Sequence, residues 1–295
     1  MTDVADFATA TYGTTWLTAD TSATDRRCMG ALFMDADIPV LNSTALAIAH
    51  LREDEERIGP REITAEVLLD PLMTLKVLAY AGARHRRSQS GDAETIEAAL
   101  LMTGTTPFFR DFVNLPVIEE TLAAYPEIQL GLLRIMARAR RAAIFAGDWA
   151  AYRQDLDIDV IIEAALLHDA VEMLVWCFAP ELALRMVMVR RKNPTMRSRD
   201  IQLSVLGVEL NELRATLFKA WRLSTLLQRL TSDDHIEHPQ VKTVQLATSL
   251  ARHSANGWDD RALPDDYCGI AALLNVTPEW VIERVCEPTT EPATG

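Results

Sequence analysis

The feature that most constrains the fold of this chain is a long series of helix signals with no alternating strand pattern between them. From Asn42 onward, most segments combine apolar residues at helical spacing with a capping residue at the start or a Gly or Pro at the end. In the absence of a sheet, such helices bury their apolar faces against one another. The sequence therefore predicts an all-α protein, and no sharp repeat period indicates a solenoid.

Asp70 and Pro71 illustrate these signals. Asp is a favoured N-cap, Pro is favoured at the first helical position, and a broad apolar face follows until Gly82, which is predicted to end the helix. Asn42, Ser43 and Thr44 are possible N-caps in the same way. The predicted helices cover about residues 42–57, 70–81, 94–102, 128–145, 157–178, 208–221, 241–253, 265–274 and 278–285.

The two ends of the chain differ from this helical body. Residues 1–37 are rich in Thr and Ala, and residues 7–19 have β-branched and aromatic character without helical spacing. We expect an N-terminal extension that is partly ordered, with at most a short strand. Residues 287–295 contain Pro, Thr and Gly but no core-forming side chain, so we expect a disordered tail.

The charge balance excludes some classes of partner. The 295 residues include 29 Lys and Arg and 42 Asp and Glu, a formal net charge of −13. This charge opposes attraction to nucleic acid and to anionic membranes. No stretch has the pattern of a signal peptide or a membrane span, so we expect a cytoplasmic protein. The four cysteines form no CxxC pattern and are expected to be reduced thiols.

The adjacent His168 and Asp169 are weak evidence alone, because a His-Asp dipeptide often arises by chance. Their surroundings add an ordered series of blocks: ITAEVLLDPLMTLKVLAYAG, ETIEAALLMTG, EAALLHDAVEMLV, VELNELRATLFKAWRL and VQLATSLA. In this order, over about residues 38–286, the series resembles the HDOD family, bacterial output domains related to the HD phosphohydrolases. The resemblance implies a helical subdomain over about residues 38–115, packed on a degenerate HD-type bundle over about residues 116–286. It also implies a role in bacterial signalling, often near cyclic di-GMP circuits.

The resemblance also allows a residue-by-residue comparison with the metal site of the HD phosphohydrolases. These enzymes hold a divalent cation with an upstream His, the His-Asp pair and a downstream Asp. Here the upstream position is Arg138, whose guanidinium has no lone pair, and the downstream position is Thr248, a weak ligand. We therefore expect no metal, no cofactor and no catalytic residue, with His168 and Asp169 as a vestigial polar pair. A retained metal ligand is the alternative.

The stretch SDDHIEHPQ leaves an enzymatic alternative open. Its His235 and His238 could complete a metal site with His168 and Asp169. The chain would then be a metal-dependent phosphohydrolase or a cyclic-dinucleotide phosphodiesterase. The other interpretation is a solvated loop that precedes the next helix.

Basic clusters leave a third function open. Arg138, Arg141, Arg190 and Arg191 are candidates for binding a phosphate-bearing ligand, which would make the chain a cyclic-dinucleotide receptor without catalysis. They could also meet an acidic partner or simply be solvated. The stretch that includes Arg190 and Arg191 is expected to be an interhelical loop.

The leading hypothesis is a non-catalytic cytoplasmic signalling protein that acts by binding another signalling protein. Aromatic side chains often anchor such interfaces. Tyr12 and Trp16 in the extension, and Trp258, Tyr267 and Trp280 near the end of the chain, are the candidate anchors. The oligomeric state stays open.

Overall fold

The structure is a computed structural model that describes residues 25–84, 93–193 and 195–286. Within these ranges the only strand-like pairing is an isolated parallel bridge between Val40 and Val117, so the all-α prediction is confirmed. The helices are α2 (Asp25–Asp35), α3 (Asn42–Glu53), α4 (Pro60–Val67), α5 (Pro71–Arg84), α6 (Ile96–Thr103), α7 (Thr105–Asp111), α8 (Ile118–Thr121), α9 (Pro126–Tyr152), α10 (Ile158–Leu167), α11 (Ala170–Phe178), α12 (Pro180–Lys192), α13 (Ser198–Leu206), α14 (Leu210–Ala220), α15 (Thr225–Leu230), α16 (Pro239–His253), the 3-10 turn η2 (Ser254–Asn256), α17 (Leu263–Leu274) and α18 (Pro278–Cys286).

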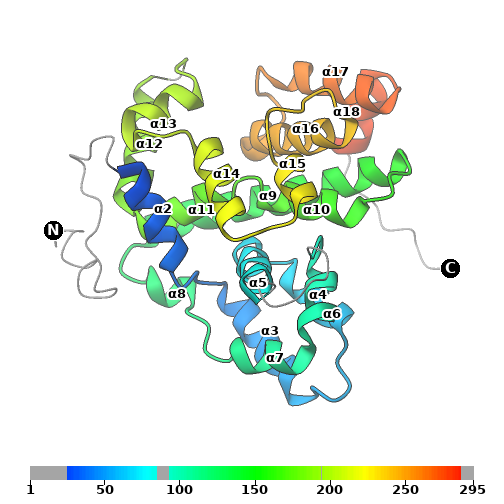
Figure 1. Cartoon of the computed structure of the whole chain (residues 1–295). Coiled ribbons are helices and arrows are strands. Elements are labelled where there is room, and N and C mark those ends of the chain that lie inside the picture. The colour runs from blue at the N-terminus through cyan, green and yellow to red at the C-terminus, as the bar shows by residue number, and fades with distance from the viewer. Residues whose placement is uncertain (1–24, 85–92, 194, 287–295) are drawn as a thin grey trace. The chain divides into compact units, whose positions relative to one another are not determined.

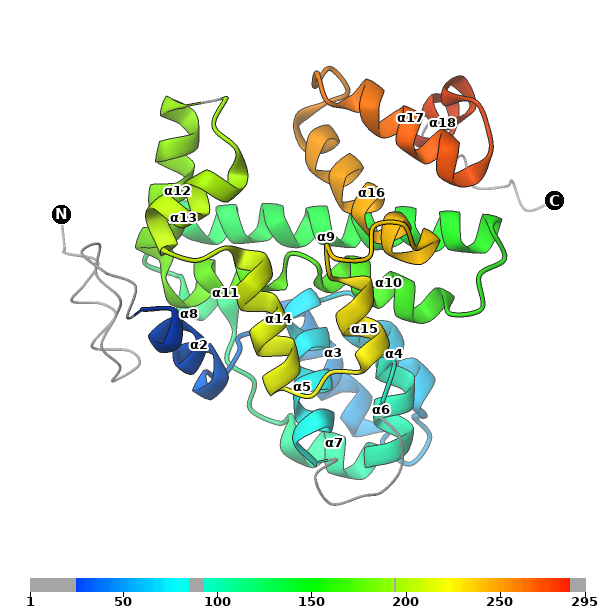
Figure 2. The same ribbon diagram turned by 45° about the horizontal axis from the view of Figure 1, so that its top comes forward.

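The chain divides into two compact units, each built from two separate stretches of sequence. The first unit takes residues up to 137 and 169–228, and the second takes residues 138–168 and those from 229 onward. The long helix α9 contributes its first part to one unit and its remainder to the other. Figures 1 and 2 show the helices of both units. Among the described residues, no helix combines the length and apolar character needed to cross a membrane.

A buried carboxylate organises the first unit. Asp70 is fully buried and caps α5, because its Oδ1 accepts hydrogen bonds from the backbone N–H groups of Leu72 (2.9 Å) and Met73 (3.2 Å). Its Oδ2 accepts the N–H of Leu41, at the start of α3, at 2.7 Å. Burial raises the pKa of Asp70, although these backbone hydrogen bonds act in the opposite direction. The predicted N-cap role of Asp70 is confirmed.

The core of the first unit surrounds α5 and α11. Every residue of α11 except Glu172 is buried, and this helix packs against α5, α12 and α14. Aromatic rings fill much of the remaining space: Phe33 of α2 lies 6.1 Å from Phe178 of α11, centroid to centroid. Phe108 lies 4.8 Å from Phe112 in the same way. The apolar stripes of the helices thus meet in one interior.

The second unit is a bundle in which α16 packs against α10 and α17, and α17 packs against α18. Val241, Val244 and Ala247 of α16 are fully buried or nearly so. Polar side chains join the helices at their ends: Arg153 donates to the Thr243 hydroxyl at 2.9 Å, and Gln240 donates to Asp157 at 3.1 Å.

The single helix predicted over residues 157–178 is wrong, because the structure divides it into α10 and α11. The division falls on the two residues of interest. His168 keeps helical backbone angles, but Asp169 has φ −96° and ψ 14°, outside the α-helical range. The hydrophobic pattern continues through this position, so apolar spacing alone could not reveal the break.

The predicted helix end at Gly82 is also wrong, because α5 continues to Arg84. A Cβ at Gly82 would lie 2.1 Å from the backbone carbonyl oxygen of Trp221, which no side chain can approach so closely. Glycine is thus required by a close contact between the end of α14 and α5. Helix α6 ends at Thr103, close to the predicted end at residue 102, and Gly104 follows with φ 86°.

Other expectations have mixed outcomes. The prediction of an interhelical loop at Arg190 and Arg191 is wrong, since both residues lie in the last turn of α12. The N-cap predicted at Asn42, Ser43 or Thr44 is wrong, because α3 already starts at Asn42 and Leu41 is its N-cap residue. Helix α2 lies within the expected extension. Free thiols are found at Cys177, Cys268 and Cys286. Residues 7–17, where at most a short strand was expected, and the predicted tail lie outside the described residues.

We predict that Gly82→Ala destabilises the protein by about 2–3 kcal/mol, because the added methyl group forces α5 and α14 apart. Gly30→Ala is the matched control: it also lies in a helix, and its Cβ would meet Leu213 at an ordinary 3.9 Å. The control should be neutral or stabilising by up to about 1 kcal/mol, since Ala favours helices. Urea unfolding followed by circular dichroism measures both. Equal effects in the two variants would contradict the close contact at Gly82.

We predict that Asp70→Ala lowers the free energy of unfolding by about 3 kcal/mol, because it leaves buried N–H groups of two helices without an acceptor. Thr95→Ala serves as a control for losing an N-cap, since the Thr95 hydroxyl accepts only the Ala98 N–H, at 3.1 Å. That variant should lose about 1 kcal/mol. A loss at position 70 no larger than at position 95 would mean that Asp70 acts only as a local cap.

Candidate functional site

His168 and Asp169 occupy the two-residue break between α10 and α11. The His168 side chain is half-buried and Asp169 is only 9% exposed, and neither residue is without an interaction partner in the chain. His168 belongs to the second unit and Asp169 to the first. The dipeptide therefore joins two helices, and a boundary between the two units along the sequence falls between its residues.

Thr248 and Arg138, which the sequence analysis placed at two ligand positions of the HD phosphohydrolases, have other contacts in the structure. The Thr248 hydroxyl donates to the carbonyl oxygens of Val244 (3.0 Å) and Gln245 (2.9 Å) within α16, and the residue is only 4% exposed. Arg138, on α9, is half-buried and has an interaction partner in the chain. A hydroxyl bound to its own helix and a guanidinium do not fit a divalent cation.

His235 and His238 lie in the turn region before α16, where both are exposed and their ring centroids are 6.2 Å apart. His238 is the N-cap residue of α16, and Pro239 is the first residue of that helix, as the solvated-loop interpretation expected. Over the described ranges, no three His, Cys, Asp or Glu side chains are gathered closely enough to hold a metal ion. The structure does not bring these histidines together with His168 and Asp169 in such a group.

Arg141 is engaged within the second unit. Its guanidinium donates to the Ser254 hydroxyl and, at 3.3 Å, to the Ser254 carbonyl oxygen. It also lies 5.4 Å from the ring centroid of Trp258 and 5.7 Å from that of Phe145, distances typical of cation–π contacts. These contacts tie α9 to the end of α16, so Arg141 has a structural role whether or not it binds an anion.

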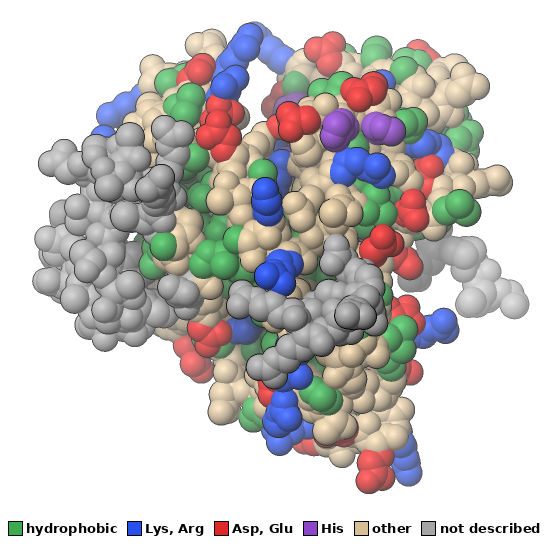
Figure 3. Space-filling model, viewed as in Figure 1, with side chains coloured by type: hydrophobic (Ala, Val, Ile, Leu, Met, Phe, Trp, Pro, Cys, Tyr) green, Lys and Arg blue, Asp and Glu red, His purple; other side chains and the backbone are tan. Residues whose placement is uncertain are grey.

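Arg190 and Arg191 lie on α12 in the first unit, whereas Arg138 and Arg141 lie in the second. Both α12 residues are exposed, and Arg190 donates to the Ser198 hydroxyl at 2.7 Å. In Figure 3, Lys and Arg side chains are visible along the upper edge of the molecule, in the region of α12 and α13. The four arginines thus do not form one cluster within a single unit.

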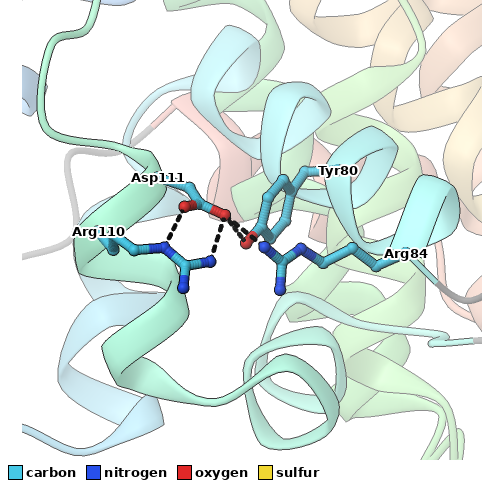
Figure 4. Close-up of polar contacts among 4 residues, drawn as sticks. All are labelled: Tyr80, Arg84, Arg110 and Asp111. Carbon is cyan, nitrogen blue, oxygen red and sulfur yellow. Dashed lines mark hydrogen bonds and ion pairs between the residues drawn. The ribbon is translucent and has the colours of Figure 1, made fainter.

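The first unit also contains a polar cluster that the sequence analysis did not find, formed by Tyr80, Arg84, Arg110 and Asp111 (Figure 4). The Asp111 carboxylate accepts hydrogen bonds from the Tyr80 hydroxyl at 2.6 Å, from Arg84 at 2.5 Å and from Arg110 at 2.7 Å. The Arg84 guanidinium also lies 4.6 Å from the Tyr80 ring centroid. The cluster ties the end of α5 to the end of α7.

The chemistry of this cluster is that of a fixed ion network. Hydrogen bonds from Arg110 and then Tyr80 hold the pKa of Asp111 well below its usual value, so the carboxylate stays ionised. Partial burial, followed by the hydrogen bond to Asp111, raises the pKa of Tyr80 to about 12. Two guanidinium groups share one carboxylate, which leaves a net positive charge at this end of α5.

A second His and Asp pair lies in the second unit. His253 Nδ1 is 2.6 Å from Asp266 Oδ2, and His253 lines a cavity of about 380 Å³ together with Asn256, Asp260 and Arg261. Burial raises the pKa of Asp266, while the hydrogen bond with His253 opposes the rise. The pair joins the end of α16 to the start of α17. Sequence spacing gives no signal for it, because only helix packing brings the two residues together.

The expected aromatic anchors differ in accessibility. Trp258 is 41% exposed and Trp280 is half-buried, with its ring 5.3 Å from that of Tyr152. Tyr267 is only 8% exposed, so its predicted place on a docking surface is wrong. Tyr12 and Trp16 lie outside the described residues.

Comparison with known proteins adds a family and a fold. The family model described as HDOD domain matches residues 38–236. No curated protein matches the chain.

Two solved structures have similar folds. The MmoQ response regulator from Methylococcus capsulatus str. Bath matches with a TM-score of 0.65 and 16% sequence identity, over 86% of this chain and 100% of that chain. A virulence factor from Campylobacter jejuni subsp. jejuni matches with a TM-score of 0.62 and 16% identity, over 90% of this chain and 93% of that chain. At these identities the likeness concerns the fold alone.

We predict that Asp111→Asn lowers stability at neutral pH and that the difference from the wild type shrinks in acid. A carboxyl group whose pKa is lowered on folding stabilises the fold above its ordinary pKa of 3.8, and this contribution is lost as the pH falls below that value. Urea unfolding of both proteins at several pH values between neutral and about pH 3 measures the difference. Asp54→Asn, which removes an exposed carboxylate of the same unit, controls for the change in net charge. A difference that does not depend on pH would contradict the ion network.

Proposed function

The chain belongs to the HDOD domain family, and from this premise we propose that it is a bacterial, cytoplasmic regulatory protein of a signalling pathway that acts by binding another protein. In this proposal the chain catalyses no reaction. The observation that carries the proposal is the state of Thr248, which stands where an HD phosphohydrolase would have its downstream Asp.

Thr248 supports the loss of the metal site by its geometry as well as by its chemistry. Its hydroxyl is directed at two carbonyl oxygens of α16 and is buried there, so it offers a neutral and already engaged oxygen instead of a carboxylate. Divalent cations favour carboxylate and imidazole ligands over such a group. The Thr248 hydroxyl instead forms hydrogen bonds within α16.

Arg138, at the expected upstream ligand position, also supports the loss of the metal site. A guanidinium is protonated at all physiological pH values and offers no lone pair. A positive charge at a ligand position also opposes a cation by direct repulsion. With both substitutions, only His168 and Asp169 remain of the four groups, and the residues present do not fit a metal ion.

Binding to another protein is the function that such a scaffold can still perform. Helical bundles offer exposed ridges and grooves that recognise segments of other proteins. Trp258 is one exposed aromatic side chain that such a contact could use.

We predict that protein purified without a chelator contains far less than one equivalent of iron, manganese or zinc, because the substituted side chains do not hold a cation. Elemental analysis of the wild type and of His168→Ala measures this. The two proteins should give the same low metal content, and neither should hydrolyse a phosphodiester.

A metal content that depends on His168 would contradict the proposed function. About one equivalent of metal in the wild type that is lost in His168→Ala would show a retained site and would favour the hydrolase alternative. His235→Ala and His238→Ala would then show whether the exposed histidines take part, because loss of metal in those variants requires them as ligands.

A further inference from the structure

The α12–α13 pair of the first unit carries an unusual charge distribution. We call residues 182–193 and 195–199, which comprise most of α12, the described residues after it and the first two residues of α13, the basic arm. The arm contains six Lys and Arg residues and no Asp or Glu. The rest of the chain holds 23 Lys and Arg against 42 Asp and Glu, a net charge of −19. The arm is thus a concentrated positive region on an acidic protein.

The exposed side of the arm mixes cationic and apolar side chains. Helix α12 has buried residues only near its beginning, at Pro180, Leu182 and Ala183. Farther along, Arg185, Met188 and Lys192 follow the i, i+3, i+7 spacing of one helix face, and all three are exposed.

Two apolar side chains stand out in this region. Met188 is 59% exposed, and Leu203, on the adjacent helix α13, is 42% exposed. Figures 1 and 2 show α12 and α13 side by side. A partner at this surface would therefore meet apolar contacts as well as charge.

Part of the positive charge is engaged within the protein. Arg190 donates to Ser198 at 2.7 Å, and Arg199 forms an ion pair with Glu209 at 2.7 Å. By contrast, no carboxylate among the described residues forms an ion pair with Arg191, Lys192 or Arg197, all of which are exposed. These three cations are available to an external anion.

Helix stability explains only some of these cations. Arg191 and Lys192 lie in the last turn of α12, where the helix dipole favours positive charge. Arg197 is the N-cap residue of α13 and Arg199 lies in its first turn, where the dipole favours negative charge. Arg199 is paired with Glu209, and Asp200 in the same turn suits the dipole. Arg197 has neither a carboxylate partner among the described residues nor a favourable place in the dipole, so its presence points to a role outside the fold.

We propose that the basic arm is the docking surface for the protein partner and that the partner presents a short acidic segment with apolar side chains, such as one face of an amphipathic helix. This inference rests on the proposed function and names the chemistry of the partner. Carboxylates of the segment meet Arg191, Lys192 and Arg197, and its apolar side chains contact Met188 and Leu203. Met side chains adapt readily to such surfaces.

The charge outside the arm favours a short protein segment over a long polyanion. The 13 residues of α12 span about 20 Å. A nucleic acid or an anionic membrane would extend past this length and meet a chain whose remaining net charge is −19. Exposed apolar side chains also gain more from the apolar face of a peptide than from a phosphate backbone.

Fluorescence anisotropy of the full chain with a labelled peptide tests the inference. The probe is an amphipathic peptide of about 14 residues, made of Glu, Leu and Ala, which matches the length of α12 when helical. We expect binding that weakens as ionic strength rises from about 0.05 M to about 0.5 M. Arg191→Glu combined with Arg197→Glu should weaken binding at least about tenfold, and Met188→Ala about fivefold.

The matched control is Arg57→Glu combined with Arg261→Glu, which changes the net charge equally at exposed residues outside the arm. It should change the affinity less than about twofold. A version of the peptide with Ala in place of Leu should bind more weakly and should not distinguish Met188→Ala from the wild type. Circular dichroism confirms that each variant folds.

Other outcomes overturn the inference. Equal losses in the arm variant and the control variant would mean that only net charge matters. Tighter binding to an oligonucleotide, or to vesicles of phosphatidylcholine and phosphatidylglycerol, that is lost in the arm variant would assign the arm to nucleic acid or lipid. Self-association lost in the arm variant, with no peptide binding, would assign it to a second copy of the chain.

The test separates this inference from the proposed function. If the wild type holds a metal that depends on His168, the proposed function fails, yet arm-dependent peptide binding would still stand. If the metal is absent and the arm binds no peptide, the arm inference fails while the non-catalytic interpretation survives.

Discussion

The buried carboxylate of Asp70 is the interaction on which the first unit depends. It accepts N–H groups at the starts of α3 and α5, whose first residues are far apart in the sequence. The same stretch of backbone that enters α3 also pairs with the start of α8, through Val40 and Ile118. One ionisable group therefore fixes the starts of two helices, next to a backbone hydrogen bond that fixes a third, and burial makes each hydrogen bond of Asp70 costly to lose.

Helix α5, which Asp70 caps, packs against α11 in the core of the unit. Helix α11 is almost wholly buried, and α12 begins at Pro180, two residues after α11 ends at Phe178. The basic arm therefore follows directly after a buried helix of the core. A docking surface on such a base loses little conformational entropy when a partner binds, which favours affinity.

The metal chemistry of the HD phosphohydrolases and the proposed docking role place different demands on a chain. A metal site requires carboxylates and imidazoles to converge, and here two of the expected positions carry Thr248 and Arg138. A docking surface requires only exposed charge and apolar contacts held by a rigid element. Fully exposed Lys and Arg are tolerated at such positions because water solvates them until a partner replaces it.

The sequence by itself determined the all-α class, the family resemblance and the cap at Asp70. These follow from local propensity and residue chemistry, which the chain carries at each position. Only the tertiary structure decided the break at Asp169, the need for Gly82, and the Tyr80–Asp111 and His253–Asp266 contacts. Each of these depends on which helices approach one another. Apolar spacing predicts that a helix has a buried face, but it does not predict which helix packs against that face.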